Sequence, residues 1–99
     1  MESIKMTEQQ IVNAICLYIA GKRQVSPYEV AVELMYDDEY GYSAEVFAGE
    51  RRQILVQANM MEALRMWIDQ EWGKDPFAAR LQLHVDEEEG IVAFARFGG

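Results

Sequence analysis

Apolar residues near the start of the chain recur with the spacing of one helical face. They are Ile11, Ala14, Ile15, Tyr18 and Ile19. Thr7 is a suitable N-cap residue, and Gln10 three residues later completes a capping box with it. Gly21 is placed to end the segment, because glycine favours the left-handed conformation that follows many helices. The pattern therefore predicts an amphipathic helix between Thr7 and Gly21.

A period of two then replaces the helical spacing. The apolar members of this alternation are Val30, Val32, Leu34 and Tyr36. The residues just before it, Ser26-Pro27-Tyr28-Glu29, instead have the form of a capping box with proline at the first helical position. Because alternation over eight residues outweighs one local cap signal, we expect a strand from about Glu29 to Asp37.

Four further strands are predicted by alternating apolar residues. They cover residues 42–48, 53–58, 81–86 and 91–97. Short polar connections that contain glycine join the successive strands of each group. Connections of this length indicate antiparallel hairpins.

A second helix is predicted between the third and fourth strands. Its apolar face is Met60, Leu64, Trp67 and Ile68. Asn59 is the expected N-cap residue, with Glu62 at the capping-box position. Arg65 and Asp69 are four residues apart, so we expect them to pair on the solvent-exposed side.

The order of elements is therefore α-β-β-β-α-β-β. An α+β fold of two layers is expected, with both helices packed on one face of a mainly antiparallel sheet. Residues 1–99 are expected to form a single domain, because a chain of this length has room for one modest core. We find no internal repeat in the sequence, and the order of strands in the sheet stays open.

The net charge and the cysteine content limit the cellular compartments and the partners that we expect for this protein. The chain has 9 Lys and Arg against 17 Asp and Glu, a net charge of −8. Nucleic acids and anionic membrane surfaces are therefore not expected as partners, because both repel such a chain. One cysteine excludes an internal disulfide, and no apolar run resembles a signal peptide or a membrane span. These features predict a cytoplasmic protein.

The sequence contains no assembled catalytic motif, so no catalytic residue is predicted and an enzyme is not expected. His84 is the only histidine, and it alternates with the apolar set of its strand. Cys16 lies in the apolar stripe of the first helix, where a buried and unreactive thiol is expected. We predict no cofactor.

Two acidic turns are weak candidates for a divalent-metal site or a small-ligand site. Their residues are Asp37, Asp38, Glu39, Asp86, Glu87, Glu88 and Glu89. If both hairpins ended at the same edge, these carboxylates could gather around one cation. Neither turn has the alternating ligand pattern of a calcium loop, which favours solvated hairpin tips instead.

Aromatic and methionine side chains suggest a contact surface. Tyr40 and Tyr42 flank the first hairpin turn, and Met66 lies beside Trp67 away from the main buried stripe. Such residues are enriched where proteins meet, although they also fill cores. The leading hypothesis is therefore a non-enzymatic domain that acts through protein–protein contact or as a homo-oligomer.

The two glycines at positions 98 and 99 allow one more hypothesis. Ubiquitin-like sulfur carriers are small proteins that end in a diglycine. The similarity covers only Gly98 and Gly99, and the pair follows Phe97 closely. A sulfur-carrier role is therefore the least favoured alternative, because a two-residue motif occurs often by chance.

Three segments resemble a family of small proteins from Firmicutes. They are MTEQQIVNAICLYIAGKRQV, VELMYDDEYGYSAEVF and DPFAAR. They are similar to the YxcD-like family of uncharacterised proteins, and the resemblance covers most of the chain. It implies a cytoplasmic bacterial protein of unassigned function, and it offers no catalytic residues to transfer.

Overall fold

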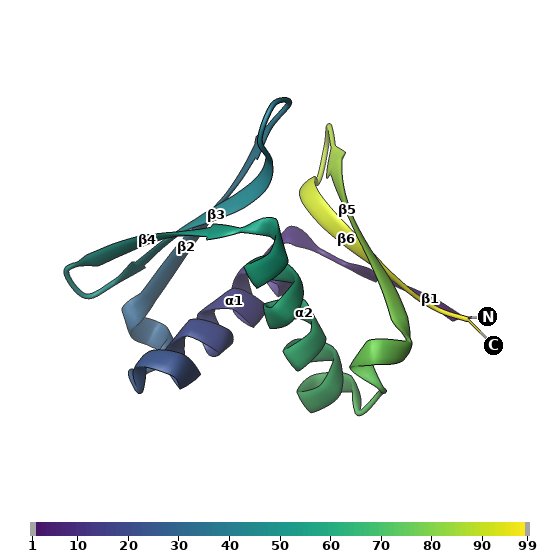
Figure 1. Cartoon of the computed structure of the whole chain (residues 1–99), viewed down its shortest axis with the longest axis horizontal. Helices are drawn as coiled ribbons and strands as arrows, with labels where there is room; N and C mark the ends of the chain where they lie inside the picture. Colours follow the sequence, from purple (N-terminus) through teal and green to yellow (C-terminus); the bar gives the residue numbers. More distant parts are fainter. Residues whose placement is uncertain (1, 99) are drawn as a thin grey trace.

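The computed structural model describes residues 2–98 as two α-helices beneath two three-stranded sheets (Figure 1). The strands are β1 (Glu2–Met6), β2 (Val30–Asp37), β3 (Gly41–Ala48), β4 (Arg51–Val56), β5 (Ala79–Asp86) and β6 (Gly90–Phe97). The helices are α1 (Glu8–Arg23) and α2 (Gln57–Trp72), followed respectively by the short 3-10 helices η1 (Pro27–Glu29) and η2 (Pro76–Ala78).

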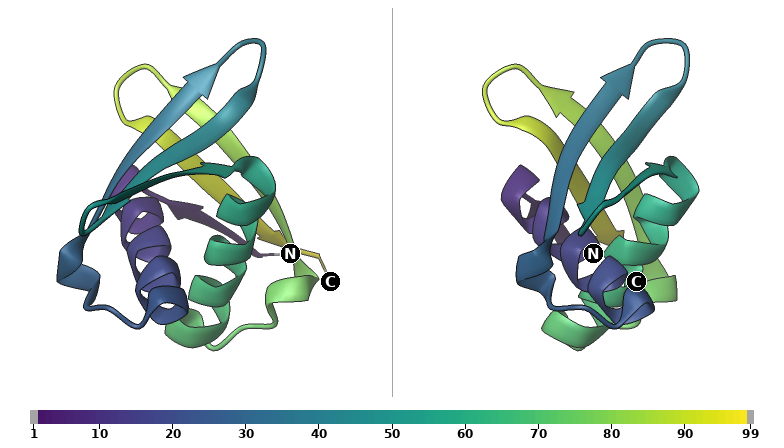
Figure 2. Two further views of the ribbon diagram at one scale, coloured as in Figure 1. Left: turned by 60° about the vertical axis from the view of Figure 1, so that its left-hand side comes forward. Right: turned by 90° about the vertical axis from the view of Figure 1, so that its left-hand side faces the viewer.

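The strands are divided between two sheets. One sheet has the order β1-β6-β5 and the other has the order β2-β3-β4, and every pairing is antiparallel. Figure 2 shows the β2–β3 and β5–β6 hairpins extending in the same direction, away from the helices. The helices therefore cover one side of both sheets and leave the opposite side as an outer face.

The described chain consists of two structural repeats of a strand, a helix, a 3-10 helix and a hairpin. The first repeat is residues 2–48, and each element of the second begins 49 residues later. Both helices have 16 residues and all four hairpin strands have 8. Both hairpin turns end at a glycine with φ of +78°, Gly41 and Gly90. The expectation of no internal repeat was therefore wrong.

The repeats exchange their first strands. In β1, Ile4 lies opposite Ala95 of β6, and in β4, Gln53 lies opposite Val46 of β3. These two pairs occupy equivalent positions, so the exchange is reciprocal and in the same register. Two subunits of a strand-swapped, two-fold symmetric dimer have this relation, and here it occurs within one chain.

The core lies where α1 and α2 pack against each other and against the inner faces of the sheets. Three equivalent pairs on the helices are fully buried, namely Ile11 with Met60, Ala14 with Ala63, and Ile15 with Leu64. The helix of each repeat also contacts the hairpin of the other repeat. The Glu8 carboxylate accepts a hydrogen bond from the backbone N–H of Ile91 at 2.9 Å.

The predicted α+β class and the order α-β-β-β-α-β-β are confirmed. Strand β1 precedes this order and was not predicted, because of its five residues only Met6 is buried. The strands also form two sheets rather than one. This division follows from the exchange, since each repeat supplies a hairpin to one sheet and an edge strand to the other.

Several element boundaries differ from the prediction. Helix α1 continues through Gly21 and stops at Gln24, which adopts the left-handed conformation. Helix α2 begins at Gln57, so Asn59 lies inside it, and the N-cap residue is Val56, which makes no side-chain cap. The two competing signals around Pro27 are both real, because a capped 3-10 helix leads directly into β2.

Candidate functional site

The outer face of the β2-β3-β4 sheet exposes large apolar side chains. Phe47, Ile54 and Val56 are 39%, 43% and 57% exposed. The strand register places them on the side opposite the buried Ala44, since side chains alternate along a strand. Met35 lies on the same face, across from Ser43, and is half-buried. We refer to Met35, Phe47, Ile54 and Val56 as the apolar face.

The equivalent outer face of the β1-β6-β5 sheet has a different character. Its exposed side chains are all polar, namely Ser3, Lys5, Arg80, Gln82, His84 and Arg96. Arg96 stands at the position of Phe47, Lys5 at that of Ile54, and His84 at that of Met35. Its apolar members are Phe94, which is half-buried, and Val92, which is 1% exposed. The fold therefore accepts charged residues where the apolar face has hydrophobic ones.

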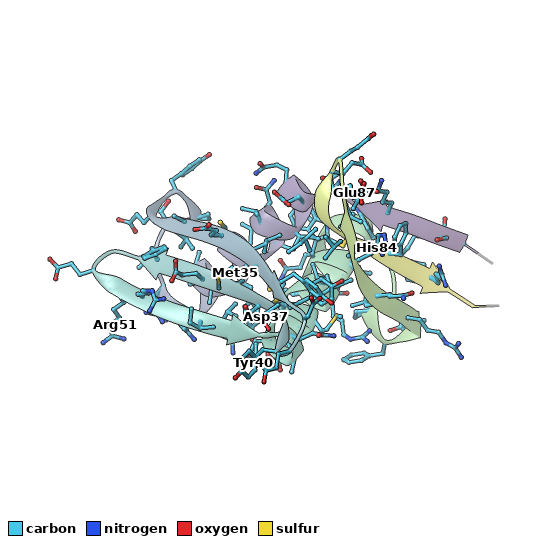
Figure 3. The ribbon with its side chains drawn as sticks, turned by 90° about the horizontal axis from the view of Figure 1, so that it is seen from above. Met35, Asp37, Tyr40, Arg51, His84 and Glu87 are labelled. Atoms are coloured by element: carbon cyan, nitrogen blue, oxygen red, sulfur yellow. The ribbon has the colours of Figure 1, made fainter. Side chains whose placement is uncertain are left out.

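Figure 3 views these outer faces from above. Met35 and His84, which are equivalent residues of the two repeats, are seen on neighbouring hairpins. The apolar face also carries charges, because the Arg52 side chain pairs with the Glu45 carboxylate. Glu33 lies beside Glu45 on the neighbouring strand β2. Acidic side chains therefore lie on β2 and the central strand β3 of this face, and the basic Arg52 lies on the edge strand β4.

The two acidic turns do not come together. In Figure 3, Asp37 and Glu87 lie on opposite sides of the molecule. Among residues 2–98, no group of three or more His, Cys, Asp or Glu side chains is arranged to hold a metal ion. The other acidic candidates, Asp38, Glu39, Glu88 and Glu89, belong to the same turns, and Glu89 pairs with Lys5.

One carboxylate in each turn serves the turn itself. Asp37 accepts hydrogen bonds from the backbone N–H groups of Glu39 and Tyr40, at 2.7 and 3.0 Å. Asp86 accepts the equivalent bonds at 2.8 and 3.0 Å, from the N–H groups of Glu88 and Glu89. Because hydrogen bonds from these two N–H groups favour the ionised form, the pKa of Asp86 is lowered.

The four predicted contact residues occupy different environments. Tyr40 is 83% exposed at the tip of the β2–β3 hairpin. Tyr42 packs against Tyr36, with ring centroids 4.7 Å apart, and touches the core. Met66 and Trp67 are half-buried and also pack against the core. The structure therefore does not gather them into one surface, and only Tyr40 is widely accessible.

The remaining candidates stand apart from one another. His84 is exposed on β5, with its ring 6.3 Å from that of Phe94. Cys16 is half-buried, and burial raises the pKa of its thiol, so the neutral form is favoured. Gly98 follows directly on β6, and Gly99 lies outside the described residues. Within residues 2–98, no helix is long and apolar enough to cross a membrane.

The apolar face was not predicted from the sequence. The segment around Ile54 has apolar residues on both faces of the strand, so the sequence does not indicate which face is exposed to solvent. A repeated motif could have revealed it, because Asp-x-Glu-x-Gly occurs at Asp37–Gly41 and again at Asp86–Gly90. With this alignment, the two outer faces can be compared position by position.

The fold and its surfaces define a small α+β protein of two strand-exchanged repeats. The chain belongs to the family described as a protein of unknown function, DUF2653, whose model matches residues 1–88. It is 28% identical over 89 residues to the uncharacterised protein YxcD of Bacillus subtilis (strain 168), which covers 89% of this chain and 87% of that protein. No solved structure matches the chain. The predicted family resemblance is confirmed, and the function of the family is unknown.

Proposed function

We propose that this protein is a non-enzymatic, cytoplasmic domain that self-associates through the apolar face of its β2-β3-β4 sheet. The supporting observation is the contrast between equivalent positions, where the β2-β3-β4 sheet exposes Phe47 and Ile54 and the β1-β6-β5 sheet exposes Arg96 and Lys5. The fold accepts charged residues at these positions, so stability does not explain the apolar ones. Exposed groups of large apolar side chains mark contact sites.

A second copy is the occupant that the charges on this face favour. Glu33 on β2 and Arg52 on β4 lie at opposite edges of the sheet, on either side of β3. A two-fold axis parallel to the strands would bring opposite edges of two copies together, so that Glu33 of each copy would approach Arg52 of the other. Symmetric dimers of this kind are the commonest oligomers, and sheets pack face to face through apolar side chains.

Sedimentation velocity over a range of concentrations tests the proposal. We expect the wild type to sediment as a dimer, and a double variant with Phe47→Arg and Ile54→Lys to sediment as a monomer. Both substitutions introduce the residue that the other sheet has at the equivalent position, so the circular dichroism spectrum should not change. Added positive charge also reduces the net charge of −8. Weaker repulsion would favour association, so loss of the dimer would report loss of apolar contact.

Gln82→Lys is the matched control, because it adds a positive charge to the outer face of the other sheet. We expect this variant to remain a dimer. A wild type that stays monomeric at every concentration would contradict the proposal, and so would a double variant that stays fully dimeric.

A further inference from the structure

Among the positions at which the two repeats differ, one faces the 3-10 helices. In the second repeat, Arg65 donates hydrogen bonds to the carbonyl oxygens of Pro76 and Ala79, the latter at 3.2 Å, rather than pairing with Asp69 as predicted. In the first repeat, the equivalent residue is Cys16. Its thiol donates to the carbonyl oxygen of Val30, at 3.5 Å, and Val30 is the counterpart of Ala79.

A cavity accompanies the shorter side chain. It has a volume of about 350 Å³ and lies between α1, η1 and α2, with walls that include Cys16, Pro27, Tyr28, Trp67 and Glu71. This volume is within the range of small-molecule sites. The second repeat holds the Arg65 guanidinium group where the first repeat has this open space, and Pro27, the counterpart of the acceptor Pro76, lies in its wall.

The walls of this cavity suit a positively charged group. Glu71 is exposed and makes no ion pair with any residue between 2 and 98. Its counterpart, which lies in the first repeat, is Lys22, whose Nζ is 4.7 Å from the ring centroid of Tyr18. The charge at this position is therefore reversed between the repeats, so the cavity beside Cys16, which has Glu71 in its wall, is the one that attracts a cation.

Two aromatic rings add to this preference. Tyr28 is 99% exposed at the rim, and the indole ring of Trp67 forms part of the wall. Cations bind to the faces of such rings, and arginine does so more often than lysine. The Trp67 N–H is buried and has no partner in the described part of the chain. By contrast, the hydroxyl of Tyr18, the equivalent residue, donates to Glu62. The polar group is therefore paired at Tyr18 and unpaired at Trp67, and this N–H does not itself favour a guanidinium ligand, which has no acceptor.

We propose that this cavity binds the guanidinium group of an external ligand, in the place that Arg65 fills in the second repeat. The guanidinium group would donate to the Glu71 carboxylate and to the carbonyl oxygen of Pro27, the counterpart of Pro76, and it would stack against the rings of Tyr28 and Trp67. A planar group with several N–H donors suits this combination better than an ammonium group. The ligand is either a small organic cation or an arginine side chain of another polypeptide, and both present the same chemistry.

Thermal unfolding with two pairs of probes tests the proposal. Methylguanidinium represents the free cation, with neutral methylurea as its isostere. N-acetylarginine amide represents the polypeptide side chain, with N-acetylcitrulline amide as its isostere. We expect a saturable rise in the melting temperature with at least one guanidinium probe at millimolar concentration, because a ligand that binds only the native state stabilises it. Neither neutral isostere should produce a saturable rise.

Two variants locate the binding. Cys16→Arg should fill the cavity and abolish the response, and Glu71→Gln should weaken the affinity by about tenfold or more through loss of a charge-assisted hydrogen bond. Glu50→Gln removes one charge from the β3–β4 turn and should leave the response unchanged.

A response to N-acetylarginine amide alone would support the site and assign its ligand to a polypeptide. A response to both probes would show that the guanidinium group is sufficient. The proposal would be overturned if neither probe stabilised the wild type, or if Glu71→Gln and Cys16→Arg responded as strongly as the wild type did.

Discussion

The first repeat, residues 2–48, and the second, residues 51–97, build the same elements from different sequences. Their shared residues lie at structurally demanding positions, such as Ala14 and Ala63 in the helix contact, Pro27 and Pro76 in the 3-10 helices, and Gly41 and Gly90 in the turns. Exposed positions differ in charge and polarity. Burial and turn geometry therefore constrain this fold, and the outer surfaces were free to diverge.

The two divergent regions are the outer faces of the sheets and the surroundings of positions 16 and 65. On the outer faces, the β1-β6-β5 sheet has charged or polar side chains where the β2-β3-β4 sheet has apolar ones. At positions 16 and 65, the first repeat has a cysteine and the second an arginine. Since the backbone plan is shared, these differences do not reflect the needs of the fold. Each residue thus predicts what its counterpart in the other repeat can accept without unfolding.

We expect the largest difference in stability between equivalent variants of the two repeats at the hairpin turns. Gly41→Ala and Gly90→Ala both place a side chain at φ of +78°, which costs about 1–2 kcal/mol. At Gly90 the new Cβ would also overlap the Glu8 carboxylate, whereas at Gly41 the nearest atom is Gln57 Oε1 at 3.6 Å. Moving Glu8 sacrifices its hydrogen bond to Ile91, so we expect Gly90→Ala to lower the free energy of unfolding by about 2 kcal/mol more.

Urea unfolding of the two variants measures this difference. Equal destabilisation by the two substitutions would show that Glu8 does not stabilise the β5–β6 turn. It would also contradict the contact between Glu8 of the first repeat and the hairpin of the second. Glu8→Gln in a wild-type background should give a smaller loss than Gly90→Ala, because the amide oxygen can still accept the N–H of Ile91.

A smaller, pH-dependent effect is expected at Asp86. The N–H groups of Glu89 and Glu88 lower the pKa of its carboxyl, so the native state binds this proton less readily than the unfolded state does. The carboxylate therefore stabilises the fold above its unfolded pKa, and the contribution is lost as the pH falls through the lowered native value. We expect Asp86→Asn to have a lower melting temperature than the wild type at neutral pH, with the difference shrinking below about pH 4.

Melting curves from pH 7 to pH 2 follow this difference. Glu87→Gln controls for the loss of one charge in the same turn. A gap between wild type and Asp86→Asn that stayed constant over this range would contradict the assigned hydrogen bonds.

Much of the fold could be predicted from hydrophobic spacing. The alternation from Val30 to Tyr36 and the helical spacing from Ile11 to Ile19 both correspond to real elements, because these patterns come from burial on one face. Strand β1 could not be found in this way, since most of its residues are exposed. The start of α2 was misplaced because Val56 caps it without a side-chain hydrogen bond.

The candidate sites could not be predicted by considering the sequence one residue or one element at a time. Clusters of aromatic and methionine side chains pointed to Met66 and Trp67, which the structure places against the core. The exposure of Phe47 depends on the division into two sheets, and the cavity beside Cys16 depends on where η1 folds back. Both are properties of packing between distant segments, and single-strand or single-helix patterns do not encode them.

The contrast between the outer faces of the two sheets depends on the reciprocal strand exchange, which nuclear Overhauser effects between backbone protons can test directly. The structure predicts cross-strand effects between the residues flanking Ile4 and Ala95, and between those flanking Gln53 and Val46. If each first strand instead paired within its own repeat, Ile4 would face Val46 and Gln53 would face Ala95. Observing that second set would contradict the exchange, and observing the first would establish it.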